Sequence, residues 1–325
     1  MTRSTVLLVA VLLLLAVAHL VVPLVPLLEL RRTDPSLAAL LLTEIRLPRT
    51  LLAAGYGAVL GMTGAALQAM FANPLASPDI TGSSSGAALG AVLGAYWFGI
   101  VDPLALAAFG AGGAGLALVG LLLLAGRRSD TATLLLAGVA IALAAGAATS
   151  LLLALAPSPF AFYDSFEWLM GSFVDRSLPQ AAAALIPAGL ACALLVRRAR
   201  ALDRMALGED VAASLGHPPR RLAVEVVALS AIAVGACVSV CGAIGFVGLI
   251  APYAARRMSG GHPGRALMPA ALIGAILLLA ADLTVRFAPA GRIIPVGILT
   301  TVIGTPLFIW LVVGMRQRLT GRLTS

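Results

Sequence analysis

The sequence has no lysine, and all 22 of its basic residues are arginine. A Walker A loop requires a lysine that reaches the phosphates of the nucleotide, so the chain lacks that kind of ATP site. Its glycines at 242, 245 and 248 are spaced unlike a dinucleotide fingerprint, and it has no Ser-His-Asp, HExxH or CxxC arrangement. We therefore predict that the chain is not an enzyme. If ATP drives its work, another polypeptide must hydrolyse it.

Charged residues are scarce, at 11% of 325 residues, whereas 60% of the chain is hydrophobic and the mean hydropathy is +1.03. Soluble domains carry about 25% charged residues, so this composition excludes one and indicates a polytopic membrane protein. We expect a single all-α membrane domain over 1–325, with about ten helices of about 20 residues each. The expected spans lie near 5–28, 47–71, 80–99, 103–125, 132–155, 179–197, 222–244, 246–259, 267–287 and 296–315.

Metal-binding residue types are also few. The three cysteines fall inside apolar segments, at Cys192, Cys237 and Cys241. The last two share a helix face without a nearby histidine, which favours packing over a metal site. The three histidines are scattered and have no evident partner: His19, His217 and His262. We predict no metal site and no cofactor.

One charge pair is expected inside the ninth span, where Asp282 and Arg286 lie four residues apart on one helix face. Pairing reduces the cost of placing a charge in a membrane. We interpret the pair as structural, with a proton relay as the alternative. No series of acidic residues or histidines follows it along other spans, which argues against an ion-coupled pump.

The first apolar run allows two interpretations. Arg3, the apolar residues after it and the sequence Ala-Val-Ala at 16–18 are typical of a cleaved signal peptide. The run continues to Leu28, however, which is the length of a membrane span. We favour the span.

The arginines lie between the apolar spans, which argues against a nucleic-acid surface despite the net charge of +8. With the N-terminus inside, 15 arginines lie on the inner side and 7 on the outer side. This is the direction of the positive-inside rule, so we predict that both termini are cytoplasmic. The outer arginines are Arg31, Arg32, Arg46, Arg49, Arg176, Arg286 and Arg292.

A polar loop with two prolines, at 73–79, interrupts the apolar run that begins after Arg49. Each proline lacks an N–H and disfavours helix in the residue before it, and Asn73 and Ser77 can cap the neighbouring backbone. The loop is either an ordinary tight turn at the cytoplasmic face or a hinge at the inner mouth of a pathway.

Glycines recur every four residues after this loop, at Gly82, Gly86, Gly90 and Gly94, and Gly57 and Gly61 do the same before it. A face of small residues lets another helix approach closely. We predict that these glycines pack helices and bind no solute.

The most charged connection, 198–221, combines apolar positions with breaks at Gly208 and Gly216 and ends at two prolines. Short amphipathic helices are expected, either lying on the membrane interface or forming a docking surface for a cytoplasmic protein. Because the acidic pair Glu209 and Asp210 suits an anionic leaflet badly, we favour docking.

Several motifs now resemble the FecCD-type permease subunits of ABC importers for iron-siderophores, haem and cobalamin. They are RLPR at 46–49, NPLASPD at 73–79, LLLAGVA at 134–140, WLMGSF at 168–173, LGEDVAASLG at 207–216, GFVGLIAPYAAR at 245–256 and IPVGILTTVIGTPLF at 294–308. The resemblance covers nearly the whole chain from Arg46. Tyr253, the turn at 262–264 and Ile293 depart from the family pattern.

This resemblance implies a multi-pass protein of the cytoplasmic (inner) membrane that contacts lipid. Its partners would be two copies of an ATPase subunit, a second permease subunit (the same chain or a paralogue) and an extracytoplasmic binding protein. The coupling helices that contact the ATPase would contain Leu207, Gly208, Glu209, Asp210, Leu215 and Gly216. Arg46 and Arg49 match arginines that receive acidic residues of the binding protein, and Arg292 is a third candidate.

We expect small and weakly polar groups along the path, because a bulky chelate must pass without being held. The candidates for pathway or gate are Gln68, Asn73, Pro74, Ser77, Ser83, Ser84 and Ser85. The NPLASPD form favours a ferric siderophore, with haem or cobalamin as alternatives within the family. An ion-coupled secondary transporter or channel is the alternative from another class.

Overall fold

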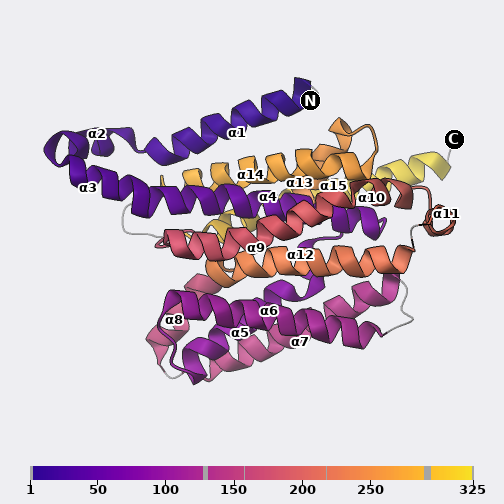
Figure 1. Ribbon diagram of the computed structural model, residues 1–325, viewed down its shortest axis with the longest axis horizontal. Helices are drawn as coiled ribbons and strands as arrows, with labels where there is room; N and C mark the ends of the chain where they lie inside the picture. Colours follow the sequence, from indigo (N-terminus) through magenta and orange to yellow (C-terminus); the bar gives the residue numbers. More distant parts are fainter. Residues whose placement is uncertain (1–2, 127–130, 157, 217, 289–293, 324–325) are drawn as a thin grey trace.

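The apolar segments fold into helices because lipid offers no hydrogen-bond partner, so each segment must satisfy its own backbone. A computed structural model of the chain describes residues 3–126, 131–156, 158–216, 218–288 and 294–323, and helices are the only regular structure in these ranges. The long helices run side by side along one direction (Figure 1).

The helices of the N-terminal half are α1 (Arg3–Val21), α2 (Leu24–Thr33), α3 (Pro35–Leu40), the π-helical η1 (Leu41–Arg46), α4 (Leu47–Met70), the 3₁₀ turn η2 (Pro78–Thr81), α5 (Ser83–Trp97), α6 (Pro103–Ala125) and α7 (Thr131–Ala154). The second half contains α8 (Pro159–Leu169), α9 (Leu178–Arg197), α10 (Ala199–Met205), α11 (Glu209–Ser214), α12 (Pro219–Cys241), α13 (Val247–Met258), α14 (Pro263–Val285) and α15 (Val296–Leu323).

A helix lies in each of the ten predicted spans, and the all-α membrane fold is confirmed. Within the described residues, seven helical stretches are long and apolar enough to cross a membrane. α5 and α13 are shorter, and α15 contains an apolar stretch at Val296–Trp310. The span predicted at 5–28 is wrong in its extent, because α1 ends at Val21 and Pro23 separates it from α2. The sequence analysis did not anticipate α2, α3 and α8.

α10, α11 and the end of α15 lie at one end of the bundle, and the start of α1 lies between that end and the middle (Figure 1). α2 and α3 lie at the opposite end. Both termini therefore belong to one side of the molecule. That this side is cytoplasmic stays a prediction from the arginine distribution.

Close helix pairs meet through glycine. Gly57 and Gly61 of α4 face Gly274 and Ala270 of α14, where a Cβ on either α4 glycine would overlap a backbone carbonyl. Gly86 and Gly90 of α5 meet Gly113 of α6 in the same way. Helices attract one another in lipid mainly through such close contact, so the expected packing role of these glycines agrees with the structure.

The largest buried side chains include Tyr56, Phe173 and Ile244, which pack in one cluster with the fully buried cysteines of α12, Cys237 and Cys241. The Tyr56 hydroxyl donates to the carbonyl of Gly242 at 3.3 Å. Burial in this cluster agrees with the packing role expected of the two cysteines.

We predict that Gly274→Val lowers the unfolding temperature of the purified chain, with a cost of about 1–3 kcal/mol. The added Cβ would meet the backbone of Gly57, which cannot move aside as a flexible side chain would. Gly112→Val is the matched control, because a Cβ at Gly112 meets nothing within 4 Å. Equal unfolding temperatures for the two variants would contradict the packing role.

Candidate functional site

The loop after α4 is held by its own polar groups. The Asn73 side chain accepts the backbone N–H of Leu75 at 2.9 Å, and the Asn73 N–H donates to the Gln68 carbonyl at 3.2 Å. Asn73 therefore caps the turn, as expected. Ser77 precedes η2 without a side-chain cap, and its hydroxyl instead lies 3.5 Å from an Asp79 carboxylate oxygen.

The start of α5 brings the predicted serines together with two residues that the sequence analysis did not select. Ser83 is buried, with its hydroxyl 2.8 Å from that of Thr81. Ser84 donates to Asp79 at 3.3 Å. Ser85 is half-buried, and Asp79 remains exposed. The sequence signal for Asp79 was its place in the 73–79 motif, directly before the serines.

Two neighbouring helices hold the segment from Pro78 to Gly82 through glycines. The Pro78 ring packs against Gly248 of α13, and the Ile80 carbonyl lies against Gly138 of α7. Gly82 takes a left-handed conformation at φ +72°, which suits glycine and turns the chain into α5. Movement of α7 or α13 would therefore act directly on this segment.

Gln68 connects α4 to α13. Its side-chain nitrogen donates to the Leu249 carbonyl at 3.5 Å, and the side chain is 1% exposed. Its Oε1 atom has no hydrogen-bond partner among the described residues. A buried acceptor of this kind is costly, which marks Gln68 as a position of functional interest.

The connection 198–221, called the coupling segment below for its expected role, forms two short helices, α10 and α11, and breaks at Gly208 and Gly216, as predicted. In α10, Leu202 and Met205 are buried in the bundle, and Asp203 accepts the N–H of Gly264 at 2.8 Å. α10 is therefore fixed to the start of α14.

α11 instead presents apolar side chains outward. Leu207, Val211 and Leu215 are 63%, 44% and 51% exposed, and Glu209 and Asp210 occupy the first turn of the helix. Exposed leucines beside an acidic pair are typical of a surface that another protein covers.

A cavity of about 420 Å³ lies between the loop after α4 and the coupling segment. Asn73 and residues 69–72 line one side, and Met205, Gly208 and Glu209 line another. Ala132 and Leu135 of α7 complete it. The coupling segment and the candidate gate thus border one space, which was not evident from the sequence.

At the opposite end of the bundle, Asp282 of α14 is buried within a group of basic residues. Arg49 donates to both carboxylate oxygens, at 2.7 and 3.0 Å. His19 Nε2 lies 2.8 Å from Oδ2 and donates to it, because a carboxylate only accepts. Arg286 lies farther away, at 3.6 Å. The expected Asp282–Arg286 pair exists, but Arg49 is the closer partner.

The same group attaches α1 to the bundle. In α1, all of which the structure describes, His19 is the single fully buried side chain. Arg46 donates to the Leu20 carbonyl at 2.9 Å, and Arg286 donates to the His19 carbonyl at 2.7 Å. Thr50 lies 2.7 Å from His19 Nδ1. The expectation that His19 has no partner was wrong, because its partners are 31 and 263 residues away in the sequence.

Arg46 and Arg49 thus form internal bonds at the end of the bundle where docking is expected. Arg46 is 8% exposed, and the Arg49 side chain is 17% exposed. Their contact with a binding protein stays a prediction, and Arg292 lies outside the described residues.

The chain is similar in sequence and in structure to known transport proteins. The FecCD transport family matches residues 6–314. The chain is 37% identical to the vitamin B12 import system permease protein BtuC of Vibrio cholerae, over 86% of this chain and 84% of that protein. It is 36% identical to the Fe(3+)-citrate import system permease protein YfmE of Bacillus subtilis, over 83% and 81%. A metal-chelate type ABC transporter solved in an inward-facing conformation superposes with a TM-score of 0.85 at 30% identity, covering 96% of this chain and 99% of that one.

We predict that Asp282→Asn destabilises the protein by about 3–5 kcal/mol, because it leaves the buried Arg49 and Arg286 without a counter-charge. The unfolding temperature of the purified chain measures the effect. Asp34→Asn is the control, since Asp34 is an exposed N-cap and asparagine caps equally well. A loss no larger than that of the control would mean that the ion pair contributes little.

Proposed function

Because this chain belongs to the FecCD transport family and is the permease subunit of an ABC importer of the cytoplasmic membrane, we propose that it carries ferric siderophores. Two permease subunits, this chain with a copy or a paralogue, enclose the path. Two ATPase subunits bind below, and an extracytoplasmic binding protein delivers the chelate. The absence of lysine, and with it of a Walker A loop, supports the division of labour with a separate ATPase.

The cavity between the coupling segment and the loop after α4 supports the mechanism most directly. In our proposal, ATP binding moves the ATPase and, with it, α11. Because Glu209 and Asn73 border the same cavity, this displacement reaches the hinge at 73–82. The hinge then shifts against Gly138 and Gly248, and the inner end of the path opens or closes.

The polar groups of the hinge suit transient contact with a solute. Ser83 and Ser84 already bond within the segment, so their hydroxyls are only weakly available. Gln68 Oε1, unpartnered among the described residues, is the candidate that can accept a bond once the helices move. We place Gln68, Asn73, Pro74, Ser77 and Ser83–Ser85 along the inner part of the path.

At the other end, we propose that the binding protein docks over the end of α2 and the start of α4. Arg49 keeps part of its guanidinium exposed, and Arg31 and Arg32 are exposed on the last turn of α2. Permanent charges that donate several hydrogen bonds suit acidic partners. Arg46, bonded to the end of α1, acts by holding this surface in place.

Cobalamin is the second candidate substrate, since one of the relatives at 37% identity is named for vitamin B12 import. Another relative is named for Fe(3+)-citrate import at 36%, so identity does not separate the two. An ion-coupled mechanism is set aside because the chain belongs to an ABC importer family.

We predict that the double variant Glu209→Arg with Asp210→Arg weakens association with the ATPase subunit about tenfold or more, because like charges would then meet at the docking surface. Co-purification of the ATPase measures the effect. Glu29→Arg with Glu44→Arg is the control, since both acids are exposed and precede α4, at the opposite end. Full association and full uptake in the Glu209 and Asp210 variant would exclude this segment as the docking site.

The substrate is tested in proteoliposomes that contain this chain, its ATPase and its binding protein. We expect ATP-dependent uptake of a ferric siderophore and none of the same siderophore without iron. Uptake of cyanocobalamin, and not of the ferric siderophore, would show that cobalamin, the second candidate, is the substrate. Uptake driven by an ion gradient without ATP would contradict the importer mechanism itself.

A further inference from the structure

Arginines surround a cavity of about 400 Å³ at the end of the bundle that holds α10 and α11. The end of α9, α10 and the start of α12 form its walls. The charged residues that line it are Arg197, Arg198, Arg200, Arg204, Arg221 and Glu225. Five positive charges face one negative charge, so the cavity favours an anion.

Glu225 is the one acid among the residues that line this cavity. Glu225 pairs with Arg198 at 2.9 Å and with Arg221 at 3.2 Å. Arg197 and Arg200 are exposed and form no ion pair within the described part of the chain. Guanidinium groups bind phosphate oxygens with paired hydrogen bonds, so a phosphate matches this chemistry.

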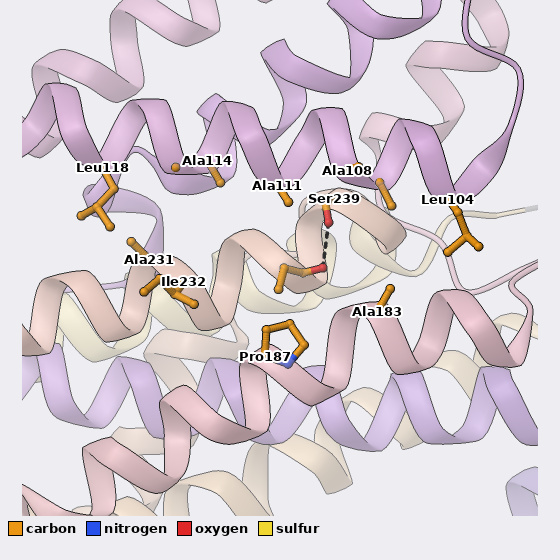
Figure 2. A pocket seen from close by; sticks show the side chains of 13 residues that line it. Leu104, Ala108, Ala111, Ala114, Leu118, Ala183, Pro187, Ala231, Ile232 and Ser239 are labelled. Atoms are coloured by element: carbon orange, nitrogen blue, oxygen red, sulfur yellow. Dashed lines mark hydrogen bonds between the residues drawn. The ribbon is translucent and has the colours of Figure 1, made fainter.

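A second cavity, an apolar groove of about 290 Å³, lies on the same helices nearer the middle of the bundle. α6 and α9 form its two sides and α12 its floor (Figure 2). The groove is open because small side chains line it, among them Ala108, Ala111 and Ala183. Its one hydroxyl, on Ser239, already donates to the Ala236 carbonyl at 2.9 Å. The groove therefore suits an apolar chain and offers nothing to a polar solute.

The two cavities share helix faces. On α9, the groove residue Pro187 and Arg197 are joined by Leu190 and Leu194, at spacings of three and four residues. Leu190 is 65% exposed and Leu194 is 44% exposed, so an apolar strip connects the cavities. On α12, Arg221, Glu225 and Ile232 follow at spacings of four and seven residues, which places them on one side of the helix.

The separation also fits one lipid molecule. Ten residues separate Arg197 from Pro187 and eleven separate Arg221 from Ile232, which corresponds to about 15 Å along a helix. One leaflet spans about half of the roughly 30 Å hydrocarbon core, so an acyl chain anchored at the arginines reaches the near end of the groove, at Pro187 and Ile232.

We propose that an anionic phospholipid of the cytoplasmic leaflet binds here, with its phosphate among Arg197, Arg198, Arg200 and Arg221 and one acyl chain in the groove between α6 and α9. Basic pockets at the cytoplasmic ends of membrane helices are suited to acidic headgroups. The site lies next to the coupling segment, because Gly216 and Pro218 also line the arginine cavity. A bound lipid therefore supports the base of α11.

Native mass spectrometry tests whether the site prefers an anionic headgroup. The sample is the purified importer, which consists of this chain and its ATPase subunits. It is titrated with phosphatidylglycerol or with phosphatidylcholine of the same acyl chains. We expect preferential binding of phosphatidylglycerol. Arg197→Ala with Arg200→Ala should weaken it about thirtyfold, at about fivefold for each arginine removed near the membrane surface. Arg31→Ala with Arg32→Ala, at the opposite end, should leave it unchanged.

The groove is tested by a matched pair on α6. Gly115 lines the groove and Gly112 does not, yet a Cβ at either glycine meets nothing within 4 Å. Gly115→Leu fills the groove and should weaken phosphatidylglycerol binding about tenfold, while Gly112→Leu should not. Equal effects of the two variants on phosphatidylglycerol binding would show that no acyl chain lies in the groove.

Three results would overturn the proposal. The first is equal affinity for the two lipids. The second is displacement of phosphatidylglycerol by millimolar inorganic phosphate, which would indicate a site for the free anion. The third is loss of the ATPase subunits from the Arg197 and Arg200 variant with lipid binding unchanged, which would make the arginine cavity a protein docking surface.

Discussion

Close approach of helices through glycine is the constraint on which the rest of this structure depends. In lipid, apolar side chains gain little by turning toward one another, so helices hold together through dense contact and internal polar bonds. Gly57, Gly61 and Gly274 bring α4 and α14 into backbone contact at the centre of the bundle. The same kind of contact, at Gly138 and Gly248, holds the hinge segment between α7 and α13. Close contact at glycine thus both packs the helices and holds the segment that we propose as a hinge.

The charged group around Asp282 attaches α1 to the bundle. α1 has one fully buried side chain, and its contact with the hydrophobic core is made by partly buried side chains such as Leu12, Leu15 and Ala16, so polar bonds at its end add to its attachment. Hydrogen bonds from Arg46 and Arg286 to its last carbonyls, and the His19–Asp282 contact, supply the attachment. Two arginines and a histidine around one carboxylate satisfy a buried charge that would be costly alone. These bonds fix α1 and the start of α4 to α14 at this end of the bundle.

Function is arranged along the axis of the bundle. The docking surface expected for a binding protein lies at the end with α2 and α3, and the coupling segment lies at the end with α10 and α11 (Figure 1). The groove lies between α6, α9 and α12 (Figure 2), and the arginine cavity lies at the ends of α9 and α12 next to α10. A lipid there would contact the transporter at its base without entering the path.

The sequence alone determined the membrane class, the helical fold and the family. Composition and the length of the apolar runs decide these, because a bilayer permits few backbone structures. It also located the loop at 73–79 and the breaks at Gly208 and Gly216, since proline and glycine act locally. It did not locate the short helices α2, α3 and α8, whose stability depends on neighbours.

Only the tertiary structure decided which polar groups meet. His19, Arg49 and Asp282 are far apart in the sequence, and no periodicity within one helix predicts that they share a site. The cavity that joins Asn73 to Glu209, and the alignment of the arginine cavity with the apolar groove, likewise depend on how the helices cross. Helix formation is a local property of the chain, whereas these contacts follow from the packing of distant segments.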